Sequence, residues 1–155
     1  MEAQEAIHVQ DLFSVSGKIA LITGGSRGIG LMMARGLLEG GARVYISSRK
    51  QAACEEAARL LSQAGPCQAL PGDVSSAEGC RQLAAALAQR TDRLHILVNN
   101  AGAAWGAPMA DYPESGWDKV MNTNVKPVFY LTRELLPMLE KAASAGDPAR
   151  VINIG

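Results

Sequence analysis

Short apolar runs alternate along the chain with longer stretches in which apolar residues recur every three or four positions. The short runs predict strands covered on both faces, because such strands are apolar throughout. The longer stretches predict amphipathic helices that bury one face. The predicted strands are 18–23, 43–48, 67–70, 95–99 and 150–154, and the predicted helices are 28–38, 51–64, 75–90 and 114–143.

Local signals mark where the predicted helices begin and end. Gly40 and Gly41 end the first helix. Ser75 with Glu78 three residues later has the form of a capping box, which predicts that Ser75 caps the third helix. The long fourth helix is expected to turn an apolar stripe inward. Its members are Trp117, Val120, Met121, Val128, Leu131, Leu135 and Leu139.

Strands that alternate with helices predict βαβ units, a parallel sheet and right-handed crossovers, and therefore an α/β fold. The chain has 155 residues, of which 48% are hydrophobic, which is enough for one domain with a core. We expect an extension over 1–16 and a single domain over 17–155.

Charge and cysteine content exclude several classes of protein. The 15 basic and 15 acidic residues balance, so there is no basic excess to neutralise a nucleic-acid backbone. We find no secretory signal and no apolar run long enough to insert into a membrane. The three cysteines, Cys54, Cys67 and Cys80, have no metal or disulfide spacing, so they are expected to be small buried residues of a cytoplasmic protein.

A glycine-rich loop, Thr23-Gly-Gly-Ser-Arg-Gly-Ile-Gly30, lies between the first strand and its helix, where a doubly wound fold binds a pyrophosphate. Gly24 would permit a turn that a side chain would not, and Gly28 would let the backbone approach the phosphates. Gly30 would let the helix pack close to the sheet. The spacing G-x-x-x-G-x-G differs from the commonest fingerprint. The alternative is a loop that is merely tight.

The end of the second strand indicates which dinucleotide is bound. NAD-binding proteins usually carry an acidic residue there for the ribose 2′-hydroxyl. This chain has Ser47-Ser48-Arg49-Lys50 instead. Arg49, helped by Arg27, would accept a 2′-phosphate, so the sequence favours NADP(H) over NAD(H). The alternative is that Arg49 and Lys50 are ordinary solvated charges.

Polar and small residues follow the next two strands at the edge where ligands lie in this architecture. Asp73, which precedes Val74, could accept a hydrogen bond from an adenine amino group, or could be a turn or cap residue. Asn99-Asn100-Ala101-Gly102 would leave room for a cofactor and supply hydrogen bonds. Two adjacent asparagines after a core strand are poorly explained by packing alone.

Asn124 is the unusual residue of the long predicted helix, because it shares the stripe of Val120 and Val128. It is therefore expected to be a buried amide that needs hydrogen-bond partners. Pro127 removes the N–H that would bond the Thr123 carbonyl, which predicts a kink. A polar side chain beside a disturbed turn suggests a water site; the alternative is a satisfied core asparagine.

Together these residues resemble the short-chain dehydrogenase/reductase family. TGGSRGIG at 23–30, Asp73-Val74, NNAG at 99–102 and Asn124 within NTNVK match its motifs in order and position. The likeness runs over 17–155 and implies a Rossmann-type doubly wound parallel sheet, truncated after the fifth strand. Within the family, the chain is most similar to 3-oxoacyl-thioester reductases.

The resemblance implies roles for the matching residues. Arg49 would hold the 2′-phosphate, and Asn124 would be the first member of the catalytic set, its backbone carbonyl holding a proton-relaying water. The pyrophosphate would be lined by Gly24, Ser26, Arg27, Gly28, Ile29 and Gly30. The adenine would be framed by Asp73 and Val74, and the nicotinamide side would be contacted by Asn99, Ala101 and Gly102.

The family's serine and its Tyr-x-x-x-Lys do not occur in these 155 residues. Tyr45 lies in a strand, and neither Tyr112 nor Tyr130 has a lysine four residues later. His95 begins a strand away from the cofactor end and is expected to be a filler residue. The chemistry needs a tyrosine to give a proton while hydride arrives from the nicotinamide. The chain alone is therefore expected to be inactive.

The function implied for the complete protein is NADPH-dependent reduction of a carbonyl, the 3-oxo group of an acyl thioester or acyl-carrier-bound substrate. It would be a cytoplasmic homo-oligomer, tetramer or dimer, with the long helix at the subunit interface. The alternative is a non-catalytic NADP(H)-binding short form or regulatory subunit. Trp105 and Met109 would line the substrate pocket or simply pack on their loop.

Overall fold

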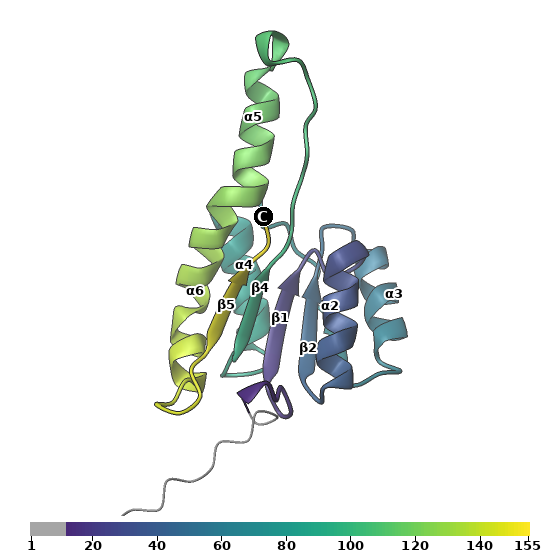
Figure 1. The fold of residues 1–155 in the computed structure, drawn as a ribbon, viewed down its shortest axis with the longest axis vertical. Helices are drawn as coiled ribbons and strands as arrows, with labels where there is room; N and C mark the ends of the chain where they lie inside the picture. The colour runs from purple at the N-terminus through teal and green to yellow at the C-terminus, as the bar shows by residue number, and fades with distance from the viewer. Residues whose placement is uncertain (1–11) are drawn as a thin grey trace, which may run out of the picture.

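The computed structural model describes residues 12–155, which contain one parallel sheet of five strands in the order β3-β2-β1-β4-β5 (Figure 1). Residues 1–11 of the expected extension lie outside the described residues. The strands are β1 (Ile19–Thr23), β2 (Arg43–Ser47), β3 (Cys67–Ala69), β4 (Ile96–Asn99) and β5 (Arg150–Asn153). The predicted α/β fold with a parallel sheet is confirmed.

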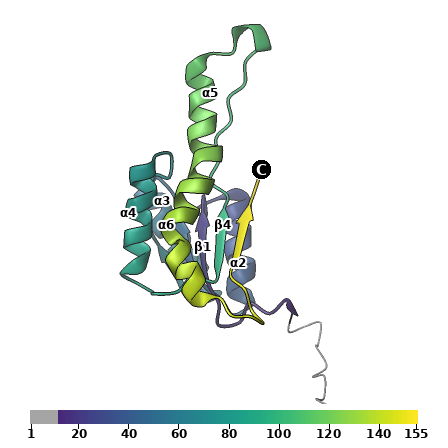
Figure 2. The ribbon, with the colours of Figure 1, turned by 90° about the vertical axis from the view of Figure 1, so that its left-hand side faces the viewer.

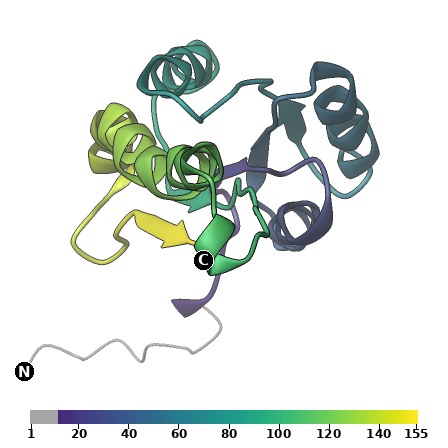
Figure 3. The same ribbon diagram turned by 90° about the horizontal axis from the view of Figure 1, so that it is seen from above.

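Helices cover both faces of the sheet, as a parallel sheet requires (Figure 3). Alternate strand residues face opposite layers: Leu21 and Tyr45 pack with the layer of α4 and α6, whereas Ala20 and Ile22 pack with the layer of α2 and α3. The four helices of these layers are α2 (Gly28–Glu39), α3 (Gln51–Leu61), α4 (Ala77–Ala88) and α6 (Lys126–Ala142).

The cap of α4 differs by one residue from the predicted one. Ser76, not Ser75, is the N-cap, and its hydroxyl accepts a hydrogen bond from the Gly79 N–H at 3.0 Å. The backbone N–H of Ser75 is instead bonded to the Asp73 carboxylate. The Ser75–Glu78 capping box is therefore wrong, because Asp73 holds Ser75 in the turn that precedes the helix.

The long fourth helix is interrupted. It consists of α5 (Glu114–Val120), a π-helical turn η2 (Met121–Val125) and α6. Figures 1 and 2 show α5 extending beyond the sheet, accompanied by the loop that follows β4 and contains the short helix η1 (Met109–Asp111). The disturbed turn predicted before Pro127 is thus present.

The predicted inward stripe holds only along α6. Leu131, Leu135 and Leu139 are buried, but Trp117 is 61% exposed. The prediction for Trp117 is wrong because α5 lies beyond the edge of the sheet and has no layer to pack on (Figure 2). Periodicity identifies the helix but not where the sheet beneath it ends.

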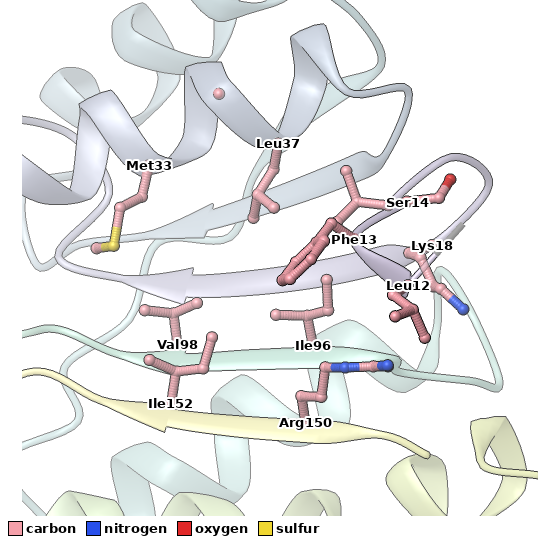
Figure 4. Close-up of a pocket in the computed structure, with 12 residues that line it drawn as sticks. Leu12, Phe13, Ser14, Lys18, Met33, Leu37, Ile96, Val98, Arg150 and Ile152 are labelled. Carbon is pink, nitrogen blue, oxygen red and sulfur yellow. The ribbon is translucent and has the colours of Figure 1, made fainter. Parts of the chain in front are cut away.

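The α2 layer leaves β4 and β5 partly uncovered. A hollow of about 450 Å³ lies there, and Met33 and Leu37 of α2, Ile96 and Val98 of β4 and Ile152 of β5 surround it (Figure 4). All four residues of β5 are exposed. The apolar side chains of β5 are therefore available to water on this face and along its open edge.

Candidate functional site

The glycine loop joins β1 to α2 at the carboxyl edge of the sheet. Gly24 has a φ of +67°, a conformation that side-chain-bearing residues rarely adopt. A Cβ at Gly30 would lie 2.3 Å from the Gly24 carbonyl oxygen, so only glycine fits there. The turn predicted at Gly24 is confirmed. The close approach predicted at Gly30 is present, but its neighbours are the loop residues Gly24 and Asn100 and not a strand of the sheet.

The N-terminus of α2 opens onto this loop. Its N-cap, Arg27, makes no side-chain capping bond, and no acidic residue lies in the first turn. The first N–H groups of this 12-residue helix are thus uncapped by side chains, and the helix dipole adds partial positive charge there. A glycine loop that leads into such an end is suited to a diphosphate.

Thr23 and Asn100, which belong to the predicted motifs but received no individual role, tie the glycine loop to the loop after β4. The Thr23 hydroxyl accepts hydrogen bonds from the N–H groups of Asn100 and Ala101, both at 3.0 Å. The Asn100 side-chain amide donates to the carbonyls of Thr23 at 3.0 Å and Gly24 at 3.4 Å. Strand alternation is the signal that points to Asn100, because it turns Asn100 to the opposite side from Asn99.

A cleft of about 740 Å³ runs along these loops. Most predicted site residues line it: Gly24, Ser26, Arg27, Gly28, Ile29, Gly30, Arg49, Ala101 and Gly102. Residues without an assigned role also line it: Ser47, Ser48, Lys50, Ala53, Gly72, Asn100 and Thr123. The structure therefore gathers the glycine loop, the end of β2 and the loop after β4 around one space.

The charges facing this cleft are basic. Arg27, Arg49 and Lys50 are exposed, and none of them forms an ion pair with a carboxylate within residues 12–155. The cleft lining includes no acidic residue. An anion with two or more phosphate groups would therefore meet cations and helix N–H groups rather than repulsion.

Three predicted site residues point elsewhere. The Asp73 carboxylate accepts from the Ser75 N–H at 3.0 Å, as the alternative turn role predicts, while Val74 is buried in the α4 layer. Asn99 is 6% exposed and its side-chain amide donates to the Asn153 side-chain oxygen at 2.9 Å. Whether any of the three contacts a cofactor stays a prediction.

Asn124 lies in the π-helical turn and is exposed, so the prediction of a buried amide is wrong. Its side chain nevertheless has partners. The Asn124 Oδ1 accepts from the Ala103 N–H at 2.8 Å, and its Nδ2 donates to the Ala103 carbonyl at 3.0 Å. Asn124 thereby fixes the start of the loop after β4 against the helix, beside the cleft-lining Thr123.

Trp105 holds the same loop against α5 farther along. A Cβ at Gly116 would lie 2.7 Å from Trp105 Cδ1, and the Lys119 ammonium lies 5.2 Å from the ring centroid. Met109 is 93% exposed. The packing role is therefore satisfied for Trp105, and Met109 remains unpacked in this chain.

The remaining candidate residues, His95 and the cysteines, have structural surroundings and not those of a reactive site. His95 Nδ1 accepts from the Ile19 N–H at the amino end of the sheet, and burial lowers the pKa of the imidazole. Burial raises the pKa of the Cys67 and Cys80 thiols to about 11, so neither is a ready nucleophile. Among the described residues no group of three or more His, Cys, Asp or Glu could hold a metal, and no helix is long and apolar enough to cross a membrane.

These features fit a dinucleotide phosphate. The glycines make a cradle that a Cβ at Gly30 would fill, and the hydroxyls of Ser47 and Ser48, which line the cleft, are buried without a hydrogen-bond partner within residues 12–155. Buried polar atoms are normally partnered, so these two hydroxyls are free to bond a polar ligand in the cleft.

Comparison with known proteins supports this interpretation. The chain is 59% identical over 143 residues to the rhamnolipids biosynthesis 3-oxoacyl-[acyl-carrier-protein] reductase of Pseudomonas aeruginosa, covering 92% of this chain and 56% of that protein. The chain thus spans about half the length of the curated relatives it matches. The resemblance that the motifs predict is confirmed.

Solved structures agree. A Pseudomonas aeruginosa RhlG/NADP active-site complex superposes with a TM-score of 0.91 at 57% identity, covering 96% of this chain and 57% of that one. An NADH-dependent reductase, A1-R′, described as responsible for alginate metabolism, gives 0.83 at 31% identity, covering 91% of this chain and 59% of that one. The fold thus serves both dinucleotides, so the fold alone does not decide between them.

The family model described as short chain dehydrogenase matches residues 18–155, from the start of β1 through β5. This match covers the glycine loop, the loop after β4 and the π-helical turn that together surround the cleft. The chain belongs to the short-chain dehydrogenase family.

Proposed function

We propose that this chain forms the NADP(H)-binding part of a carbonyl reductase. The observation that carries the proposal is the composition of the cleft: Arg27, Arg49 and Lys50 face it, and no acidic side chain lines it. A ribose 2′-phosphate would be attracted by these cations, whereas a ribose hydroxyl gains nothing from them. The NADP complex of the relative at 57% identity supports the same choice.

Different residues of the chain would bind different parts of the cofactor. Gly24, Gly28 and the N-terminus of α2 would bind the pyrophosphate, and Arg49 would bind the 2′-phosphate. Asn99, Ala101 and Gly102 remain the candidates for the nicotinamide side, and Asp73 and Val74 for the adenine. When bound, the nicotinamide supplies a hydride to a carbonyl carbon.

The carbonyl oxygen must also receive a proton. No tyrosine in these 155 residues is followed by a lysine four positions later. Asn124 would contribute through its backbone, because its side chain is occupied by Ala103. We therefore expect the 155-residue chain to bind NADPH without consuming it in the presence of a carbonyl.

The substrate class follows from similarity to the acyl-carrier-protein reductase. We propose a 3-oxoacyl thioester, carried on an acyl carrier protein, as the substrate of the whole enzyme. We further propose that the whole enzyme is a cytoplasmic homo-oligomer. A second apolar stripe on α5, η2 and α6 supports an interface there, since Trp117, Val125 and Phe129 are 61%, 50% and 62% exposed.

A non-catalytic role is the second candidate function. The observation that favours it is the cofactor cleft, whose lining is drawn entirely from residues 24–123. A chain of this kind would bind NADP(H) alone or together with full-length subunits.

The proposed cofactor is tested by titrating the purified chain with NADPH and NADH and following nicotinamide fluorescence. NADPH is expected to bind more tightly. Arg49→Glu should weaken NADPH roughly tenfold or more and leave NADH unchanged or better bound, since a charged phosphate hydrogen bond is lost. Arg43→Glu, at the far end of β2, is the matched control. Equal effects of the two variants would contradict the proposal.

The same titration separates the two candidate functions. Adding a 3-oxoacyl thioester and following absorbance of the reduced nicotinamide should give no consumption with the 155-residue chain. Measurable turnover would contradict the expectation that these residues lack the proton donor.

A further inference from the structure

Ser47 is the last residue of β2 and one of the most buried polar residues of the cleft. Its side chain is 2% exposed, and its hydroxyl has no hydrogen-bond partner within residues 12–155. It nevertheless lines the cleft. Tyr45, two residues earlier, also has an unpartnered hydroxyl, but it lies in the apolar layer beneath and does not line the cleft.

The neighbouring strand supplies a direct contrast. Thr23 is paired in register with Ser47 and is equally buried. The Thr23 hydroxyl is satisfied by the N–H groups of Asn100 and Ala101. At the same level of the sheet, one hydroxyl therefore bonds to protein and the other does not.

The backbone around Ser47 is held on both sides. Its carbonyl accepts from the Gly25 N–H of the glycine loop at 3.1 Å, and the next carbonyl, that of Ser48, accepts from the Gly72 N–H at 3.1 Å. The Ser47 backbone is thereby fixed between the pyrophosphate cradle and the loop that precedes Asp73.

Gly72 lies beside this hydroxyl. A Cβ at Gly72 would lie 3.6 Å from the Ser47 Oγ, in ordinary contact with it. Gly72 also lines the cleft. Because no protein group holds the buried hydroxyl, rotation of the Ser47 side chain would present it to a ligand in the cleft.

We propose that the Ser47 hydroxyl binds the adenosine half of the dinucleotide by donating a hydrogen bond to one of its acceptor atoms. The inference rests on the proposed function and deepens it. Arg49 would distinguish NADPH from NADH through the 2′-phosphate, whereas Ser47 would bind the part that both share. Ser47 is thus an affinity residue and not a selectivity residue.

The test compares Ser47→Ala with the wild-type 155-residue chain. Reduced nicotinamide mononucleotide, which lacks adenosine, is titrated alongside NADPH and NADH. Ser47→Ala should weaken NADPH and NADH by the same factor, roughly threefold to tenfold for one neutral hydrogen bond, and leave the mononucleotide unchanged. The melting temperature of the ligand-free variant should not fall, because the hydroxyl has no protein partner to lose.

Ser62→Ala is the matched control, since the Ser62 hydroxyl donates to the Ala58 carbonyl at 2.7 Å and lies outside the cleft. It should change no nucleotide affinity. Unchanged NADPH affinity in Ser47→Ala, or equal weakening of the mononucleotide, would overturn the inference alone. Failure of the wild-type chain to bind NADPH would overturn the proposed function and this inference with it.

Discussion

The cleft at the carboxyl edge and the hollow beside β5 are both open depressions, of about 740 and 450 Å³, but different kinds of chemical group line them. The cleft is made of glycines, hydroxyls, helix N–H groups and cations. The hollow is lined mainly by apolar side chains such as Leu37, Val98 and Ile152, with Lys18 and Arg150 also in its lining. The same sheet thus presents one surface suited to a charged ligand and another suited to an apolar one.

The difference lies in which atoms have partners. In the hollow, the uncovered surface is mainly that of apolar side chains. In the cleft, the first N–H groups of α2 have no side-chain cap, and the hydroxyls of Ser47 and Ser48 have no hydrogen-bond partner within residues 12–155. A hydrophobic surface can be covered by any complementary apolar group, whereas the cleft selects by charge and hydrogen bonding.

The largest effect is expected from adding a side chain where the glycine loop meets α2. Gly30→Ala would place a methyl group 2.3 Å from the Gly24 carbonyl and 2.6 Å from Asn100 Nδ2. We expect a loss of about 1–3 kcal/mol in the free energy of unfolding and a fall in NADPH affinity of about tenfold or more. Thermal unfolding and fluorescence titration measure both.

Gly36→Ala is the control on the same helix, at the wall of the hollow. No heavy atom lies within 4 Å of the position of its Cβ, and alanine favours a helix over glycine by up to about 1 kcal/mol. This variant should be as stable as wild type or more so, with unchanged NADPH affinity. Similar losses in both variants would mean that the two regions are not independent.

A smaller effect is expected from adding a charge to the hollow. Anilinonaphthalene sulfonate, a dye with a large apolar ring system and one sulfonate, should bind there. Ile152→Glu should weaken that binding because the carboxylate must be desolvated and repels the sulfonate. NADPH affinity should stay within about twofold of wild type, as for distant sites. Val151→Glu is the control, because Val151 is similarly exposed but points to the opposite face of β5. Displacement of the dye by NADPH would contradict the separation of the two regions.

The smallest effect concerns pH and the amino end of the sheet. Burial lowers the pKa of His95 below 6.5, and a protonated ring could not accept from the Ile19 N–H. The unfolded chain therefore binds this proton more readily, so stability should be full above pH 6.5 and fall as the pH drops below it. His95→Gln should remove this fall in melting temperature below pH 6.5. If NADPH affinity changed over the same pH range as the stability, His95 would have to lie near the cleft, which would contradict this prediction.

Sequence reasoning succeeds where the requirement is local. Gly24 and Gly30 were predicted from the position of the loop between a strand and a helix, and their backbone geometry agrees. The strands were predicted within one or two residues, since buried parallel strands are continuously apolar. The basic end of β2 could also be identified before the fold was known.

The predictions that are wrong or absent concern residues whose surroundings are set by the tertiary structure. Asn124 and Trp117 have inward helical spacing, but they lie where α5 and the π-helical turn leave the sheet, so both are exposed. Asn100, predicted only as part of a segment that supplies hydrogen bonds to a cofactor, fixes the glycine loop through Thr23, a contact across 77 residues. Ser47 became a candidate only when its hydroxyl proved to be buried without a partner.

The π-helical turn between α5 and α6 is the place where this helix can absorb a change of length. A π-helical turn takes in about one residue more than an α-helical turn for nearly the same rotation. Deleting one residue within Met121–Val125 would therefore allow an ordinary α-helix and keep α5 nearly in phase with α6, so that Gly116 still meets Trp105. The same deletion inside α6 would instead rotate the preceding helix by about 100° and turn the whole projecting segment.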